Sequence, residues 1–169
     1  MIYGKRIRLR AIERTDIPAF LRWFNDPEVR QFLAMYLPLS EAQEANWFES
    51  HLSSPDHVFG IEAQAKDGWR LIGNCGLHQI DWKNRSADFG IVLGEKEFWG
   101  QGFGTDAVQT MLRFAFQELN LHRVTLDVYE FNPRAIRCYE KTGFQREGTK
   151  RDALFRDGQY RDVYMMGIQ

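Results

Sequence analysis

The sequence is poor in cysteine and in net charge, and it contains no long apolar run. Its two cysteines, Cys75 and Cys138, lie far apart, which excludes a CxxC pair and a disulfide framework. A formal net charge of −1 argues against a protein that mainly binds nucleic acid or an anionic membrane. No segment has the apolar length of a membrane span or the apolar core of a signal peptide. We therefore expect a reducing, cytoplasmic environment.

Metal-ligand spacing and internal repeats are also absent. The four histidines form no metal-binding pattern, so no metal site is expected. What is present is typical of a globular chain: 44% hydrophobic residues, thirteen Phe and five Trp in 169 residues. No linker or low-complexity tract divides the chain. Residues 1–169 are therefore predicted to form a single domain.

Strands outnumber helices in the pattern of apolar residues. Alternating or short apolar runs predict strands at 5–12, 57–65, 70–80, 86–93, 122–131, 145–155 and 160–168. Helical spacing and capping residues predict helices after Thr15 or Asp16, from Ser40 to about Leu52, after the glycines near 102, and from Pro133. One β-α-β crossover lies in the middle. This order predicts a mixed α/β (α+β) sheet with helices on its faces.

The stretch GQGFGTDA, residues 100–107, is the strongest local motif. Glycines that lead into a helix let main-chain N–H groups close on an oxyanion, so the motif favours phosphate binding. One alternative is a tight turn with a helix cap at Thr105. Another is a dinucleotide site, because residues 102–107 fit G-x-G-x-x-A and Asp127 follows at a suitable distance. A P-loop is excluded, since no Gly-Lys-[Ser/Thr] follows.

Two longer stretches, ADFGIVLGEKEFWGQGFGTDAVQTMLRFAF and NPRAIRCYEKTGF, carry a family resemblance. Together with the tail FRDGQYRDVYMM they resemble the GNAT superfamily of acyl-CoA-dependent N-acyltransferases. Within it, ribosomal-protein N-terminal acetyltransferases and spermidine acetyltransferases are the most similar. The specific match covers residues 86–169. It implies a GNAT fold: a mostly antiparallel mixed sheet of about six to seven strands with helices on both faces.

The resemblance also implies acetyl-CoA as cosubstrate and a set of cofactor contacts. The pantetheine arm is expected along Ile91, Val92 and Leu93, and Asn132 is expected to contact the cofactor as well as cap its helix. The pyrophosphate is expected on the turn formed by Trp99, Gly100, Gln101, Gly102, Phe103, Gly104 and Thr105. Trp99 is a departure, because the superfamily often has Gln or Arg in that slot.

Three side chains are candidates for proton transfer. Tyr139 matches the tyrosine that protonates the departing thiolate, which suits a phenol of ordinary pKa about 10. Asp88 matches a position where many relatives have Glu, and it is a candidate general base acting through water. Glu62 is a second candidate, although a solvated or ion-paired role suits either carboxylate equally well. Cys138 has no neighbouring pattern that would activate it, so we expect direct transfer without an acyl-enzyme.

The acceptor is expected to be a primary amine, either a protein N-terminus or a small amine such as a polyamine. The apolar loop 27–39 and the hairpin near Phe155–Tyr160 are its expected walls. Two other functions stay open: a nicotinamide-dependent oxidoreductase and a non-catalytic CoA-binding module. No nucleic-acid or membrane partner is expected, and a homodimer is possible by analogy with relatives.

Overall fold

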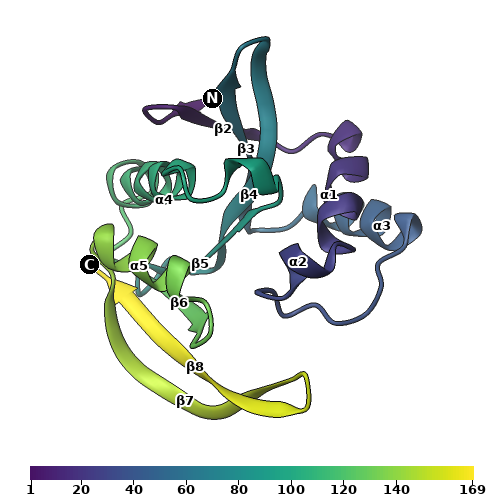
Figure 1. The fold of residues 1–169 in the computed structure, drawn as a ribbon. Coiled ribbons are helices and arrows are strands. Elements are labelled where there is room, and N and C mark those ends of the chain that lie inside the picture. Colours follow the sequence, from purple (N-terminus) through teal and green to yellow (C-terminus); the bar gives the residue numbers. More distant parts are fainter.

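The computed structural model describes all residues, 1–169, as one eight-stranded sheet with helices on both faces (Figure 1). The strand order is β1-β2-β3-β4-β5-β6-β8-β7, and only β5 and β6 pair in parallel. The predicted mixed, mostly antiparallel sheet is confirmed. The strands are β1 (Ile2–Tyr3), β2 (Ile7–Ala11), β3 (His57–Ala65), β4 (Gly68–Asp81), β5 (Ser86–Leu93), β6 (Arg123–Tyr129), β7 (Gln145–Arg156) and β8 (Gln159–Ile168).

One strand more than the expected six to seven is present. The additional strand, β1, pairs antiparallel with β2, with Ile2 opposite Leu9 and Tyr3 opposite Arg8. Two residues are too short to produce an alternating pattern, so the sequence carries no periodic signal for this strand. It extends the sheet edge without changing the fold class.

Helices α4 (Phe103–Arg113) and α5 (Pro133–Lys141) cover one face of the sheet. Val108, Met111, Leu112 and Ala115 recur at helical spacing and are buried against the inward residues of the central strands. The chain continues from α4 into a π-helical turn, Phe114–Glu118. The expected cap of α5 is confirmed: Asn132 accepts a hydrogen bond from the Ala135 N–H at 3.3 Å, and Pro133 occupies the first turn.

Helices α1 (Ile17–Phe24), α2 (Pro27–Arg30) and α3 (Glu41–His51) form a second layer on the other face. Figure 1 shows this group apart from α4 and α5. The predicted capping box of α3 is present, because Ser40 and Gln43 bond each other's main-chain N–H groups. The stretch 27–39, expected to be loop or short turns, begins with the one-turn helix α2. None of the helices combines the length and the hydropathy that a membrane-spanning helix requires.

Strands β5 and β6 separate partway along their length. Their parallel register runs only from Ser86 opposite Arg123 to Asp88 opposite Thr125. Beyond Asp88, β5 continues to Leu93 and β6 to Tyr129 without pairing to each other. Main-chain groups along that side of β5 therefore have no strand partner, and the opening between the two strands leads into the cavity described next.

Candidate active site

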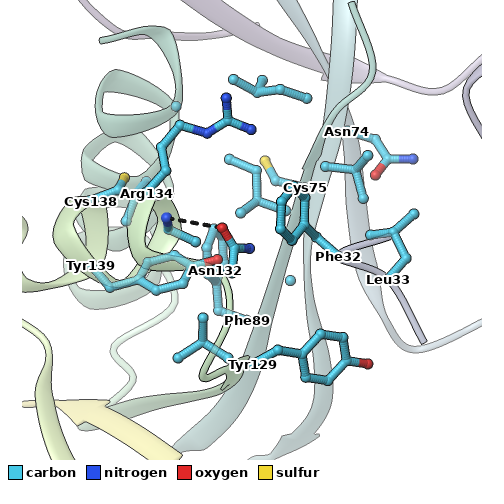
Figure 2. Close-up of a pocket in the computed structure, with 18 of the residues that line it drawn as sticks. Phe32, Leu33, Asn74, Cys75, Phe89, Tyr129, Asn132, Arg134, Cys138 and Tyr139 are labelled. Carbon is cyan, nitrogen blue, oxygen red and sulfur yellow. Dashed lines mark hydrogen bonds between the residues drawn. The ribbon is translucent and has the colours of Figure 1, made fainter. Parts of the chain in front are cut away.

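One cavity of about 1090 Å³ lies where β5 and β6 separate, and most of the expected site residues line it. It reaches from α4 and α5 on one side to the layer of α1–α3 on the other, and Figure 2 shows the two walls facing each other. The expected cofactor residues in its lining are Ile91, Val92, Leu93, Trp99, Gly100, Gly102, Phe103, Gly104, Thr105, Asn132 and Tyr139. Gln101 is exposed outside the lining, and its amide donates to the Glu97 carbonyl at 2.5 Å.

The glycine turn has the conformation that its sequence predicts. Gly100 and Gly102 have positive φ angles of 69° and 86°, which glycine adopts without strain. Helix α4 begins directly after Gly102, at Phe103, so its cap is Gly102 and not Thr105. The first N–H groups of a helix have no partner within it and carry partial positive charge. The turn therefore presents main-chain donors to the cavity.

The amino-terminal segment braces this turn. The Asp106 carboxylate accepts hydrogen bonds from the main-chain N–H groups of Lys5 at 3.0 Å and Arg6 at 2.7 Å. The Arg6 guanidinium donates to the Gln101 carbonyl and lies 4.2 Å from the centre of the Phe103 ring. These contacts hold the turn and the start of α4 against β2.

A positive charge stands beside Trp99, in the slot where the superfamily often has Gln or Arg. The Arg134 guanidinium, from α5, lies 4.3 Å from the centre of the Trp99 ring. No carboxylate pairs with Arg134, and its burial lowers the pKa of the guanidinium. The Trp99 indole donates to the Leu93 carbonyl at 2.8 Å and so fixes the position of the ring. Arg134 thus brings to the glycine turn the charge that position 99 lacks.

Tyr139 extends from α5 into the cavity with only 8% of its surface exposed (Figure 2). No protein group hydrogen-bonds its hydroxyl, yet no fully buried side-chain oxygen in the chain lacks a partner. The hydroxyl is therefore open to the cavity. Burial raises the pKa of the phenol well above its ordinary value, and the neighbouring Cys138 adds to the effect. The group keeps its proton at neutral pH.

Cys138 has no arrangement that would activate its sulfur. Its nearest polar partner is the Thr105 hydroxyl, 3.4 Å from the sulfur. Burial raises the pKa of the Cys138 thiol, which leaves it protonated and a poor nucleophile. This agrees with the expectation of direct transfer. No group of three or more His, Cys, Asp or Glu side chains is placed to hold a metal ion.

Neither carboxylate proposed as the base lines the cavity. Glu62 lies between two arginines, with an oxygen 2.7 Å from Arg8 Nε and another 3.0 Å from Arg10 Nε. Asp88 accepts a hydrogen bond from the Thr125 hydroxyl at the point where β5 and β6 separate. A base role for either one stays a prediction that this geometry does not favour.

His78 was not singled out by the sequence patterns, but it lies in the cavity lining. Its Nδ1 is 3.0 Å from an Asp56 oxygen. On the sheet it stands opposite Asp88, and its Nε2 lies over two glycines, Gly76 and Gly90. A Cβ on Gly76 would be 3.1 Å from that nitrogen, and one on Gly90 would be 3.6 Å away. The ring therefore rests on the sheet with Nε2 unpaired.

The wall opposite α5 is mainly apolar. Figure 2 shows Phe32 and Leu33 there, facing the α5 side chains. Phe32 stacks on Phe131, whose ring in turn stacks on Tyr129, with centroid separations of 6.3 and 5.5 Å. The one charged residue on this wall is Glu44 from α3. The full set on this wall is Phe24, Val29, Phe32, Leu33, Ala34, Met35, Glu44 and Trp47.

Of the two segments expected to wall the acceptor site, the loop lines the cavity as expected, whereas the hairpin lines it with residues away from its tip. Residues from the loop 27–39 line the cavity, but the tip of the β7–β8 hairpin does not. Phe155 and Tyr160 are 61% and 66% exposed and pack on each other at 4.9 Å. The hairpin contributes Lys150, Ala153 and Leu154 instead, and Arg156 ties it to the loop by donating to the Leu33 carbonyl at 2.7 Å.

The sheet excludes the dinucleotide-binding alternative. That fold needs a largely parallel sheet, whereas only one pair of strands here is parallel. Asp127, the acidic residue at a suitable distance on which the alternative relied, is paired with Lys150 Nζ at 2.7 Å. The glycine cradle fits the diphosphate of coenzyme A, because Gly100 has open space where a side chain would begin.

Comparison with known proteins agrees with this geometry. Residues 6–145 match the family model for the acetyltransferase (GNAT) domain. The chain is 32% identical over 168 residues to a spermidine N(1)-acetyltransferase of Vibrio cholerae, covering 98% of this chain and 94% of the relative. It is 31% identical to the uncharacterized N-acetyltransferase p20 of Bacillus licheniformis, covering 99% and 94%.

Solved structures show the same fold. The crystal structure of spermidine N-acetyltransferase from Vibrio cholerae in complex with CoA and spermine superposes with a TM-score of 0.89 at 30% identity. The match covers 98% of this chain and 96% of that one. A GNAT acetyltransferase from Bacillus anthracis, 22% identical, shares the fold with a TM-score of 0.84. The chain therefore belongs to the GNAT family and is an acetyl-CoA-dependent N-acetyltransferase.

Proposed function

We propose that this enzyme transfers the acetyl group of acetyl-CoA directly to a small primary amine. The observation that carries the proposal is the single cavity that joins the glycine turn, the unpaired side of β5 and the Tyr139 hydroxyl to an open apolar wall. Both halves of a two-substrate site thus meet at one place. The relative from Vibrio cholerae, named for spermidine acetylation, supports a small amine over a protein N-terminus.

On the cofactor side, the chain's own groups would bind and position acetyl-CoA. The N–H groups at the start of α4 would hold the diphosphate, with Arg134 adding positive charge beside them. The main chain of Ile91–Leu93, which pairs with no strand on the β6 side, would bind the pantetheine arm as an added strand, and one N–H there would stabilise charge on the thioester oxygen. The cosubstrate supplies the activated acetyl group.

On the acceptor side, we assign the base to His78. Imidazole suits the role, and Asp56 holds Nδ1 so that Nε2 faces the cavity. The amine nitrogen bonds to the thioester carbon as the carbon–sulfur bond breaks. An ammonium acceptor gives up two protons overall. One leaves to solvent through His78, and the other balances the proton that Tyr139 delivers to the departing sulfur and regains from water.

A thiol-release assay with acetyl-CoA and a panel of polyamines, monoamines and amino-terminal peptides tests this function. Turnover with a small amine supports it, and turnover with peptides alone would assign the protein N-terminus instead. Binding of CoA without release by any amine would favour the non-catalytic module.

Variants of His78 and Asp56 test the assignment of the general base. His78→Gln should lower kcat about a hundredfold or more. Asp56→Asn should lower it less, because Asp56 only positions the ring. Asp56 and Asp88 are the charged groups that face His78. The exposed His122→Gln serves as control. If Asp88→Asn lowers kcat by this factor and His78→Gln does not, Asp88 is the base.

A further inference from the structure

Glu44 is a buried carboxylate that no group in the protein neutralises. Only 4% of the residue is exposed, and its carboxylate takes part in no hydrogen bond or ion pair within the chain. It nevertheless lines the cavity, on the wall opposite Tyr139. Since no fully buried oxygen in the chain is without a partner, the carboxylate oxygens keep some exposed surface, and Glu44 lies in the cavity lining.

The surroundings of Glu44 make this arrangement costly. Phe24, Val29 and Trp47 share its wall, and Phe48, one helical turn further along α3, is buried in the same layer. An ionised carboxylate loses its hydration in such a place and forms no hydrogen bond or ion pair that would compensate for the loss. The other buried carboxylates differ: Asp16 and Glu62 pair with Arg10, and Asp106 accepts two main-chain hydrogen bonds. Glu44 alone lacks such compensation.

A cation entering the cavity would supply the missing partner. None of the cationic side chains that line the cavity pairs with Glu44: Arg134, Arg137 and Lys141 lie on α5, and Lys150 is paired with Asp127. Apart from the Asp127–Lys150 pair, the acceptor half has one acid and no base other than His78. It therefore suits one positive charge carried on an apolar body.

We infer that Glu44 binds a second cationic group of the acceptor, so that the preferred substrate is a diamine or longer polyamine with a methylene spacer. This inference rests on the proposed function. One amine loses its proton near His78 and attacks the thioester, while a distal ammonium pairs with Glu44. The methylene spacer packs along Phe32, Leu33 and the other apolar residues of the wall.

Matched pairs of acceptors test the inference. Each diamine from three to six carbons is compared with the monoamine that has a methyl group in place of the distal ammonium. The wild type should give a kcat/KM for the best diamine at least tenfold above that for its monoamine. Glu44→Gln, which keeps the size of the side chain, should remove this preference by lowering kcat/KM for the diamine to about that for its monoamine.

The control is Glu41→Gln, which removes the same charge from the exposed side of the same helix and should leave the preference intact. Equal kcat/KM values for both members of every pair, or a preference that survives Glu44→Gln, would overturn the inference and leave acetyl transfer standing.

Binding gives a readout that does not need turnover. Calorimetric titration of the CoA-bound enzyme with the diamine should show binding to the wild type and at least tenfold weaker binding to Glu44→Gln. If no amine releases CoA but this difference persists, the proposed function fails while the Glu44 subsite stands. Equal diamine affinity in the two proteins would overturn the subsite.

Discussion

The role of Glu62 can be tested directly. The sequence suggests that Glu62 is a catalytic base, whereas the structure suggests that it stabilises the fold by pairing with two arginines. Its carboxylate joins Arg8 and Arg10 across the β2–β3 pair, and Arg10 also pairs with Asp16 at 2.7 Å. These carboxylates raise the pKa of the Arg10 guanidinium, which stays charged at every accessible pH. Glu62→Gln would leave two half-buried guanidinium groups with less negative charge between them.

The expected loss of stability follows from burial. Removing one partner of a fully buried ion pair costs about 3–5 kcal/mol. Here the arginine side chains are 19% and 16% exposed and Arg10 keeps Asp16, so about 2 kcal/mol is expected. In a chain of this length that corresponds to a fall in Tm of roughly 4–8 °C. The rate per folded molecule should not change.

Thermal unfolding and thiol release on the same preparations measure both quantities. Glu97→Gln is the control: Glu97 pairs with Arg70 on the surface and is 59% exposed, so its loss should cost about 0.5 kcal/mol or less. If Glu62→Gln unfolds at the wild-type temperature but has lost most of its activity, the structural assignment is wrong and Glu62 acts in catalysis.

Four further outcomes follow from the site. Tyr139→Phe should lower kcat with little change in CoA affinity; because burial raises the phenol's pKa, ionisation of Tyr139 should not depress the wild-type rate below about pH 10. Gly102→Glu should abolish CoA binding in a titration, since a side chain at φ 86° brings strain and an anion into the cradle. Arg134→Ala should weaken CoA binding about tenfold, and more at low salt than at high salt, whereas an unchanged Kd would remove Arg134 from the phosphate site. Burial raises the pKa of Glu44, so its stabilising contribution is present at low pH and is lost as pH rises through the folded-state value. Relative to Glu44→Gln, the wild type should therefore melt progressively lower on going from acid to neutral pH.

The strands, the helix caps and the glycine turn could be predicted because each depends on local pattern. Alternation marks β2 and β6, Asn132-Pro133 marks the start of α5, and the glycines before Phe103 mark the cofactor turn. The same dependence on local pattern explains why β1 and α2 were not predicted. Strand β1 is too short to alternate, and α2 is one turn long between Asp26 and the loop.

The acceptor side could not be predicted, because its residues meet only through tertiary packing. Glu44 sits in a helix with acids at Glu41 and Glu49, so it looks solvent-exposed until α3 is packed on α1. A weak signal was its spacing of four residues from the apolar Phe48, which puts both on one helix face. His78 carried a similar signal: it shares strand parity with Gly76, opposite to the buried Leu77.

The contact between the amino-terminal segment and α4 has a practical consequence. Because Asp106 holds the main chain of Lys5 and Arg6, the shape of the proposed phosphate cradle depends on residues a hundred positions earlier in the chain. A deletion that removes the first six residues would therefore weaken coenzyme A binding without removing any of the proposed cofactor contacts. Expression tags for this enzyme belong at its carboxyl end.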